Sequence, residues 1–455
     1  MSIIARPALW RNRDFAKIWS AATVSVIGSQ ITMLALPFIA LTMLGAGVFQ
    51  VSALAAVEML PFLLFTLPAG AWLDRVRRRP VLVAADIGRG VTLMSIPVAY
   101  VAGSLTMWQL FAVAFVTGTF TALFDVADQS YLPAILERDD LVEGNANLQL
   151  SQSVAQIGGP TLGGNLIAVV AAPLAIVVDA LSFFVSGAFI SAVRRREEVP
   201  RRRLDPLGRP TSMRTEINAG LRFVAGNPYL RPIAACTGTT NLFGAALFGI
   251  FPVLIWHEMK FSPAFYGTVM GLASFGFLAG AALSSRLPRS IGIGPTIIIS
   301  TAFVAPAYLL VALTPESRSL AFMTLFVGWF VAGMTQVTYN VAQISLRQAI
   351  TPPEMQSRMN ATMKFIVWGT IPIGSVLGGV LATAVPVRLA LVAAAVASSL
   401  AILPVLFSPL RSLREIPEAD GHDGTNHRAS AAPHGDPPSP PILPSSPSMN
   451  EAGLP

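Results

Sequence analysis

The chain has 455 residues and a formal net charge of +7, but only 12% of its residues are charged and 53% are apolar. Soluble domains carry about 25% charged residues, so this chain has too few to cover a surface in water, and its mean hydropathy of +0.62 predicts an integral membrane protein. Its single cysteine, Cys236, excludes a disulfide framework or a thiolate metal cluster within one chain.

Apolar runs follow one another along the chain, and each is long enough to cross the hydrocarbon core, which takes about 20 residues in helical form. The first run is too long for the apolar part of a signal peptide and is predicted to be a retained span. The runs lie near residues 18–44, 49–72, 81–102, 106–129, 148–170, 173–193, 230–255, 264–285, 293–313, 319–346, 361–384 and 388–408.

Arginine and lysine gather in alternate loops. One group precedes the first run, and another follows the second run and consists of Arg75, Arg77, Arg78 and Arg79. A third group follows the sixth run, in residues 194–222. The positive-inside rule therefore predicts a multi-pass protein of the cytoplasmic membrane with both termini in the cytoplasm. The anionic lipid surface accounts for the basic charge, and no nucleic-acid partner is needed.

The runs and the composition divide the chain into segments, each predicted from a change in pattern. Beyond about residue 410 the chain is rich in Pro, Ser, Gly, Asp and His without apolar periodicity, which predicts disorder. The predicted segments are a cytoplasmic N-terminus (1–17), a first six-helix bundle (18–193), a cytoplasmic linker (194–228), a second six-helix bundle (229–410) and a disordered tail (411–455).

An internal repeat links the two predicted bundles. Residues 124–168 align with 339–383 at one constant shift, so that Asn145-Ala146 meets Asn360-Ala361. Gly159, Gly163 and Gly164 meet Gly374, Gly378 and Gly379 in the same alignment. The repeat predicts two parallel halves with a substrate site between them, near the middle of the membrane.

The segment Gly70-Ala71-Trp72-Leu73-Asp74-Arg75-Val76-Arg77-Arg78-Arg79 joins the second and third runs. It resembles the signature loop of the major facilitator superfamily, Gly-x-Leu-x-Asp-Arg-x-Gly-Arg-Arg/Lys, with Arg77 in place of a glycine. The resemblance implies an all-α integral membrane protein with twelve transmembrane helices in two pseudo-symmetric six-helix bundles.

The same resemblance implies a conformational gate. Asp74 would act on the start of the eleventh helix near Asn360, where a carboxylate is favoured, and Arg78 would pair with Asp125 or Asp128. The alternative is that the arginines only follow the positive-inside rule. The predicted gate residues are Gly70, Asp74, Arg75, Arg78, Asp125 and Asp128.

The fifth run carries a glycine–proline element made of Gly158, Gly159, Pro160, Gly163 and Gly164. It resembles the Gly-x-x-x-Gly-Pro-x-x-Gly-Gly element of the superfamily's antiporters, although the earlier glycine is absent. The resemblance implies a role in limiting leakage and favouring efflux. The alternative is helix packing alone, since small residues let helix backbones approach closely.

Further segments resemble the macrolide-efflux and enterobactin-exporter branch, a resemblance that covers residues 8 to about 410. They are Asn12-Arg13-Asp14-Phe15, Asp86-Ile87-Gly88-Arg89, Leu132-Pro133 followed by Asn145-Ala146, and Asp179-Ala180-Leu181-Ser182-Phe183. The resemblance implies export of a drug-like or siderophore-like molecule in exchange for protons.

Ionisable residues inside the predicted spans need a reason, because each costs several kcal/mol in hydrocarbon. Glu58 has no cation within one helical turn, and burial favours the neutral form of a carboxyl group, so Glu58 is the first candidate for proton coupling. Asp86 and Arg89 are three apart and can pair on one helix face. Asp86, Arg89 and Asp179 are further candidates, with a structural role as the alternative.

A polar lining is predicted if the first, fourth, seventh and tenth helices face the cavity, as the resemblance implies. No charge is expected at mid-depth in this lining, because Asp125 and Asp128 fall near the inner end of the fourth run. The candidates for substrate contact are Ser25, Ser29, Gln30, Thr121, Asn241, Gln336 and Asn340, and aromatic surfaces from Phe243, Phe248, Trp329 and Trp368 could add to them.

The sequence contains no Walker loop, no nucleophile elbow and no His-Glu-x-x-His motif. It therefore predicts no enzyme, no catalytic residue, no cofactor and no metal site. The predicted partners are a small organic molecule, protons and the lipid bilayer, with a monomeric protein. A proton-driven exporter is favoured, and an uptake permease or a non-transporting membrane sensor remain as alternatives.

Overall fold

The computed structural model describes residues 12–73, 76–136, 138–195 and 213–415. Within these ranges the chain is helical and contains no β-strand. The first part folds into α2 (Arg13–Thr42), α3 (Val48–Leu73), α4 (Arg78–Val101), α5 (Met107–Ile135), α6 (Arg138–Val169), α7 (Ala172–Ser191) and α8 (Met213–Gly226).

The second part begins with α9 (Leu230–Pro252), which continues into a π-helical turn, η1 (Val253–Glu258). Two of the following spans are each built from a pair of shorter helices that meet at Ser274 and at Phe303. The helices are α10 (Pro263–Ala273), α11 (Phe275–Ile291), α12 (Ile293–Ala302), α13 (Val304–Ala312), α14 (Arg318–Ile350), α15 (Pro353–Ala384), α16 (Val387–Ala397) and α17 (Ile402–Leu406).

Polar side chains fix where several helices begin. Asn12 caps α2 by accepting hydrogen bonds from the backbone N–H groups of Asp14 (3.1 Å) and Phe15 (3.3 Å). Thr106 caps α5 and Ser262 caps α10 in the same way. Such residues satisfy N–H groups that have no partner within the helix, so the loops between spans carry the signals that end one helix and start the next.

Eleven helical segments in the described ranges are long and apolar enough to cross a membrane. The remaining predicted run, 148–170, corresponds to α6. This helix begins earlier, at Arg138, and its first half is polar. Taking α10 with α11, α12 with α13 and α16 with α17, the helices form two six-helix bundles. The first bundle consists of α2–α7 and the second of α9–α17.

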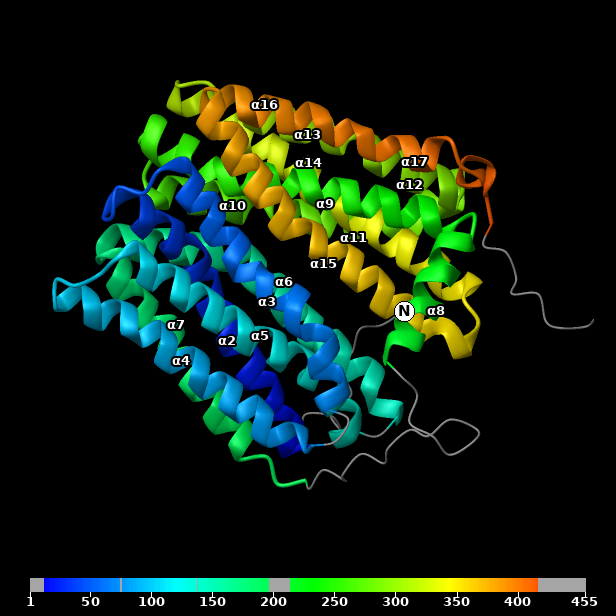
Figure 1. Cartoon of the computed structure of the whole chain (residues 1–455), viewed down its shortest axis with the longest axis horizontal. Helices are drawn as coiled ribbons and strands as arrows, with labels where there is room; N and C mark the ends of the chain where they lie inside the picture. Colours follow the sequence, from blue (N-terminus) through cyan, green and yellow to red (C-terminus); the bar gives the residue numbers. More distant parts are fainter. Residues whose placement is uncertain (1–11, 74–75, 137, 196–212, 416–455) are drawn as a thin grey trace, which may run out of the picture. The chain divides into compact units, whose positions relative to one another are not determined.

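Each bundle is held together by packing between its own helices, and two helix pairs make the most extensive contacts between the bundles. In the first bundle α2 and α4 both pack on α7, and α3 packs on α5; in the second, α9 packs on α15 and α11 on α14. The joining pairs are α3 with α15 and α6 with α10. Figure 1 shows α3 and α15 side by side where the blue and orange parts of the chain meet.

Repeated glycines make equivalent contacts in the two bundles. A Cβ at Gly163 of α6 would lie 3.2 Å from the Ile31 Cα of α2, and one at Gly378 of α15 would lie 2.7 Å from the Ala246 carbonyl oxygen of α9. The next glycine in each repeat faces the other bundle, because Gly164 meets α10 and Gly379 meets α3. The repeat therefore preserves one contact within a bundle and one between bundles.

The end of the molecule that carries Arg79, Arg194 and Arg195 is called here the arginine-rich end. Backbone N–H groups of Arg194 and Arg195 donate to the Asp14 carboxylate, at 3.1 and 2.9 Å, and the Arg195 guanidinium donates to the Ile135 carbonyl at 2.6 Å. Arg79 donates to the Ser191 carbonyl. These bonds tie the ends of α2, α4, α5 and α7 together.

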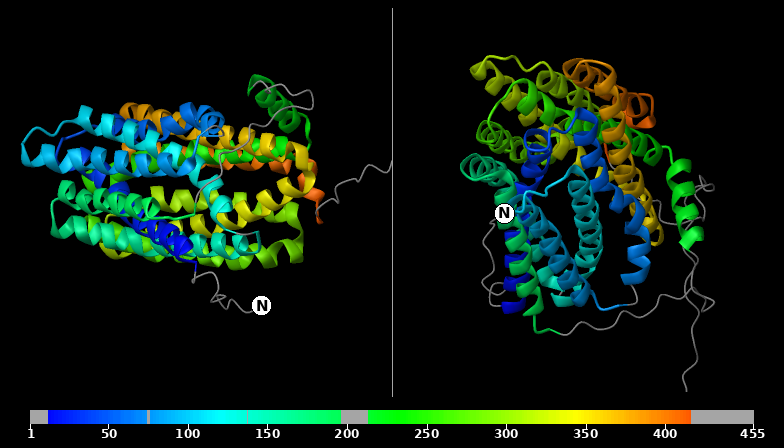
Figure 2. Two further views of the ribbon diagram at one scale, coloured as in Figure 1. Left: turned by 90° about the horizontal axis from the view of Figure 1, so that it is seen from below. Right: turned by 60° about the vertical axis from the view of Figure 1, so that its left-hand side comes forward.

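Several contacts between the bundles lie toward the opposite end. Phe38 of α2 packs edge-on against Trp256 of η1, with ring centroids 5.3 Å apart, and the Ser52 hydroxyl of α3 donates to the Gly249 carbonyl of α9 at 3.1 Å. Figure 2 shows the same two groups of helices from further directions.

Two details differ from the sequence expectations. The helix α15 begins at Pro353 rather than near Asn360, because proline suits the first helical position, and Asn360 lies inside the helix and accepts a hydrogen bond from Arg347 at 3.0 Å. The predicted linker contains α8, which packs on α15 at Gly220. Residues 1–11, 196–212 and 416–455, with most of the predicted tail, lie outside the described ranges.

Candidate functional site

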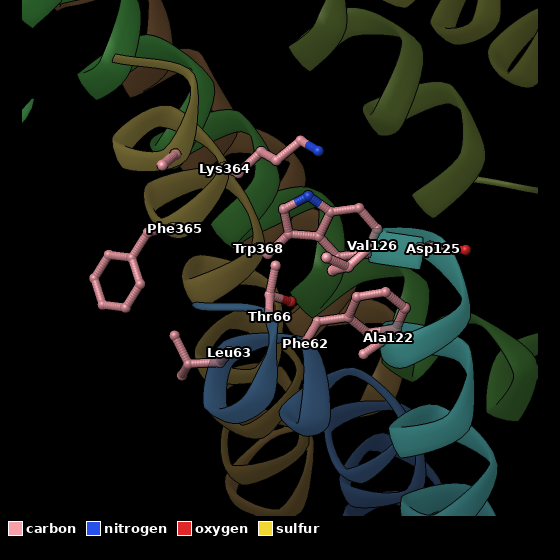
Figure 3. Close-up of a pocket in the computed structure, with 10 residues that line it drawn as sticks. Phe62, Leu63, Thr66, Ala122, Asp125, Val126, Lys364, Phe365 and Trp368 are labelled. Carbon is pink, nitrogen blue, oxygen red and sulfur yellow. The ribbon is translucent and has the colours of Figure 1, made fainter. Parts of the chain in front are cut away.

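A cavity of about 240 Å³ lies between the two bundles, where α3 and α5 of the first face α15 of the second (Figure 3). The helical repeat explains why these residues gather, since positions three and four apart share a face. The lining consists of Phe62, Leu63 and Thr66 from α3, Ala122, Asp125 and Val126 from α5, and Ala361, Lys364, Phe365 and Trp368 from α15. We call it the inter-bundle cavity.

An acidic side chain from one bundle and a basic side chain from the other line this cavity. Asp125 of α5 and Lys364 of α15 interact electrostatically. Figure 3 shows the Lys364 side chain extending from α15 past the Trp368 indole, toward the side on which α5 carries Asp125. The sequence analysis did not expect this pair: it expected no charge at mid-depth and predicted Asp125 as a gate residue, and the structure places Asp125 in the wall of this cavity together with Lys364.

Apart from Thr66, the remaining lining is apolar, and it includes three aromatic residues, Phe62, Phe365 and Trp368. Trp368 of α15 stacks on Phe62 of α3, with ring centroids 4.5 Å apart and planes inclined by 18°. Among the aromatic candidates named from the sequence, Trp368 lines the inter-bundle cavity, whereas Phe248 and Trp329 pack on each other within the second bundle, at 5.6 Å.

Asp125 also belongs to a cluster of charges inside the first bundle, which we call the acid–arginine cluster. It consists of Arg89 and Asp86 of α4, Asp125 and Asp128 of α5, and Asp179 of α7. Arg89 and Asp86 form a buried ion pair, and Arg89 interacts electrostatically with the other three carboxylates.

Apolar and polar neighbours hold Arg89 in place. Its guanidinium lies over the rings of Phe124 (4.3 Å) and Phe183 (4.2 Å), and the Ser186 hydroxyl donates to Asp86 at 2.7 Å. The carboxylate partners and the two rings together hold a cation that would otherwise be costly in this environment. The predicted Asp86–Arg89 pair is thus present and packed between helices.

Asp179 and Glu58 have different surroundings. The carboxylate of Asp179 is buried and accepts hydrogen bonds from the hydroxyls of Thr32 and Ser182, the latter at 3.2 Å. Glu58 of α3 is half-buried and interacts electrostatically with Asp179. Its side chain forms no hydrogen bond or ion pair with any residue in the described ranges.

The predicted substrate-contact residues divide into two groups. Asn241, Gln336 and Asn340 line a smaller polar cavity of about 60 Å³ within the second bundle, beside Tyr308 and Tyr339. The second group lies elsewhere and makes bonds or contacts of its own: Ser25 to Ala22, Ser29 to Ser25, Thr121 to Thr117, and Gln30 against Gly159. None of the second group lines the inter-bundle cavity.

The second bundle has a buried arginine that the sequence analysis did not single out. Arg347 of α14 donates to Gln343, one turn earlier, at 2.9 Å and to Asn360 of α15 at 3.0 Å. In the repeat alignment Gln343 corresponds to Asp128. A polar amide and an arginine thus occupy the region where the first bundle has its acid–arginine cluster.

Two of the predicted gate residues, Gly70 and Arg78, lie on either side of the α3–α4 connection. Asp74 and Arg75 fall outside the described ranges. Gly70 lies in the last turn of α3, and Arg78 begins α4. The pairing of Arg78 with Asp125 or Asp128 stays a prediction.

The glycine–proline element lies where α6 crosses α2 and α10. A Cβ at Gly159 would collide with Gln30, one at Gly163 would press on Ile31, and one at Gly164 would collide with the Pro263 carbonyl. Gly158 has open space around it. The Pro160 carbonyl faces Gly267 of α10, so the element brings two helix backbones of different bundles together.

No group of three or more His, Cys, Asp or Glu residues is arranged to hold a metal ion within the described ranges.

Comparison with known proteins shows which family the chain belongs to. Residues 5–429 match the family model described as "Transmembrane secretion effector" (MFS_3). The multidrug efflux pump Tap of Mycolicibacterium fortuitum is 27% identical over 378 residues, covering 80% of this chain and 88% of Tap. Tap of Mycobacterium tuberculosis is 26% identical over 411 residues, covering 88% and 94%.

Among solved structures, a bacterial homologue of the iron transporter ferroportin in an inward-facing state superposes with a TM-score of 0.67 at 15% identity, covering 86% of this chain and 98% of that one. Such a likeness supports the fold. Because the family model covers nearly the whole helical part, the chain is a multi-pass membrane transporter rather than an enzyme, and it belongs to the transmembrane secretion effector family of the major facilitator superfamily.

Proposed function

We propose that the chain exports a drug-like or siderophore-like organic compound across the cytoplasmic membrane by alternating access, in exchange for protons. The observation that carries this proposal is the inter-bundle cavity, which combines aromatic and aliphatic walls with one acid and one base. Apolar pockets with a few polar groups suit amphipathic organic ligands. A small and highly charged solute would find too few partners there.

Two observations support the direction of transport. Relatives named as multidrug efflux pumps cover most of the chain. The glycine–proline element resembles that of antiporters, and its glycines lie at the α6–α10 contact between the bundles. A tight contact there would resist leakage, because the crossing backbones leave no room for solvent.

Glu58 is the proposed proton-coupling residue, with Asp179 as its electrostatic neighbour. A carboxyl group in a membrane span without a cationic partner is a group that can take up and release a proton. Asp86 and Arg89 are proposed to support the cluster structurally, since they are already paired.

The proposed gate consists of Gly70, Asp74, Arg75 and Arg78 with Asp125 and Asp128. It operates at the arginine-rich end, which we place in the cytoplasm on the positive-inside rule. We also propose that the chain is monomeric and that its segments have the boundaries predicted from the sequence. Alternating access then consists of rocking the two bundles about the cavity.

Direction can be tested in cells with an overexpression screen for resistance to toxic compounds and siderophores. For any compound that responds, deleting the protein should raise its cellular content, and restoring the protein should lower it. The matched control is a strain that expresses the Asp125→Asn variant at the same membrane level. A lower cellular content after deletion would show an uptake permease instead.

A further inference from the structure

Asp125 interacts electrostatically with one cation of each bundle. Within its own bundle it interacts with Arg89, and across the cavity it interacts with Lys364. The two cations differ in surroundings: Arg89 is 5% exposed and fixed between two rings, whereas Lys364 is exposed on a helix face that lines the cavity. Of the two, Lys364 is the one that an incoming molecule can reach.

The charge around Asp125 favours a positive ligand. The acid–arginine cluster has the four carboxylates of Asp86, Asp125, Asp128 and Asp179 and the single guanidinium of Arg89. Adding Lys364 gives four carboxylates against two cations. A surplus of buried carboxylates attracts cations, because their field is poorly screened away from water.

The cavity walls suit the apolar part of such a ligand. The rings of Phe62 and Trp368 lie next to the space between Asp125 and Lys364. Aromatic faces attract cations as well as apolar surfaces. Figure 3 shows the Trp368 indole between the Lys364 side chain and the Phe62 ring.

We propose that Lys364 is a resident cation, which holds Asp125 while the cavity is empty and is replaced there by the charge of a cationic amphipathic ligand. Lys364 is then a specificity-determining residue: it competes with every ligand for Asp125, so neutral molecules cannot displace it. The proposal rests on the proposed function, because it assumes that the inter-bundle cavity is the ligand site.

Displacement has a mechanical consequence. Asp125 lies on α5 of the first bundle and Lys364 on α15 of the second. While they attract each other, separating the bundles at the cavity costs electrostatic free energy. A ligand cation at Asp125 removes that attraction, which couples ligand binding to the relative position of the bundles.

The test is equilibrium binding to the purified full chain in lipid nanodiscs, without any gradient. Two probes of nearly the same shape and opposite charge are used, tetraphenylphosphonium and tetraphenylborate. The variants are Lys364→Met, Lys364→Arg as the charge-conserving control, Asp125→Asn, and the double variant Asp125→Asn/Lys364→Met. Size-exclusion profiles check that each variant is folded.

Lys364→Met should strengthen tetraphenylphosphonium binding on the order of tenfold, the usual size of coupling between charged neighbours, and Lys364→Arg should leave it near wild type. Asp125→Asn should weaken this binding, and the gain from Lys364→Met should vanish in the double variant. Tetraphenylborate should bind more weakly than tetraphenylphosphonium to the wild-type chain.

Weaker tetraphenylphosphonium binding in Lys364→Met would overturn the proposal, and so would an equal gain in the Asp125→Asn background or a preference for tetraphenylborate. Because binding is measured without transport, a chain that imports its substrate would still show the predicted pattern. Failure of the export assays is therefore distinguishable from failure of this proposal.

Discussion

Gly164 of α6 and Gly267 of α10 lie against each other where the two bundles cross. A Cβ on either glycine would lie 3.1 Å from the Cα of the other and would also collide with a backbone carbonyl of the opposite helix. The two helices therefore touch through their backbones. A clash with an added Cβ could not be relieved by a change of side-chain rotamer.

Gly164→Ala should push α6 away from α10 and reduce transport roughly tenfold, since overpacking costs about 1–3 kcal/mol. Gly158→Ala is the matched control, because Gly158 lies in the same helix with open space around it. The measurement is substrate efflux at equal membrane expression. Equal transport by the two variants would contradict the close contact.

Arg89 should matter more for stability than any one carboxylate of its cluster. Arg89→Met leaves Asp86, Asp125 and Asp128 without their shared cation, and breaking a buried pair in this way costs about 3–5 kcal/mol. Asp86→Asn should lower the free energy of unfolding by less, because Arg89 still has other carboxylate partners in the cluster.

Thermal unfolding in detergent measures this order. Lys17→Met is the control, as Lys17 pairs with Asp14 near the surface at 2.9 Å, and such a pair contributes about 1 kcal/mol or less. The reverse order, with Asp86→Asn the more damaging variant, would show that Arg89 is not the centre of the cluster.

Glu58→Gln should abolish accumulation driven by a pH gradient while leaving ligand binding near wild type, because the amide keeps the shape of the side chain but cannot carry a proton. Proteoliposomes with an imposed gradient measure the first property and equilibrium binding the second. Glu316→Gln, in the exposed loop between α13 and α14, is the control. Gradient-driven accumulation by the Glu58→Gln variant equal to that of wild type would rule out the coupling role.

Trp368→Ala should weaken binding of an aromatic or apolar ligand by roughly 2- to 12-fold, the range expected for losing an aromatic contact of about 0.5–1.5 kcal/mol. Trp368→Phe should retain most of the affinity, since it keeps a ring against Phe62. Titration of the purified chain with one ligand separates the two variants. Identical affinities for wild type and Trp368→Ala would show that the Trp368 side chain does not contact the ligand.

The sequence predicted the fold because the physics of a membrane span is local. About 20 consecutive apolar residues mark each helix, and the constant shift between 124–168 and 339–383 marks the two bundles. The polar first half of α6 shows the limit of this signal: the helix extends to Arg138, because protein neighbours can replace lipid around polar residues.

The site was predicted less completely, because a cavity depends on which helix faces meet. Lys364 was not singled out, although a lone lysine within an apolar run is itself a signal. It lies in the run predicted for 361–384, on a helix that the resemblance did not place at the cavity. Conversely, Ser25 and Ser29 have the residue types of a polar lining, yet their hydroxyls donate to carbonyl groups of their own helix.

The linker helix α8 was also missed, since its sequence is part of the basic stretch after the sixth run and is too short for a span. The structure packs Gly220 of α8 close to the Arg358 carbonyl of α15, with a Cβ–oxygen separation of 2.7 Å if the glycine carried a Cβ. The close approach of α15 explains why position 220 is a glycine. Tertiary contacts of this kind are not visible in the pattern of a single segment.

Uptake of tetraphenylphosphonium into everted membrane vesicles that are acid inside tests the central claim most directly. An exporter that takes its ligand at Asp125 and exchanges it for protons should accumulate the cation in these vesicles, a protonophore should release it, and the Asp125→Asn variant at equal expression should not accumulate it. Accumulation in right-side-out vesicles alone, or equal accumulation by Asp125→Asn, would contradict the account.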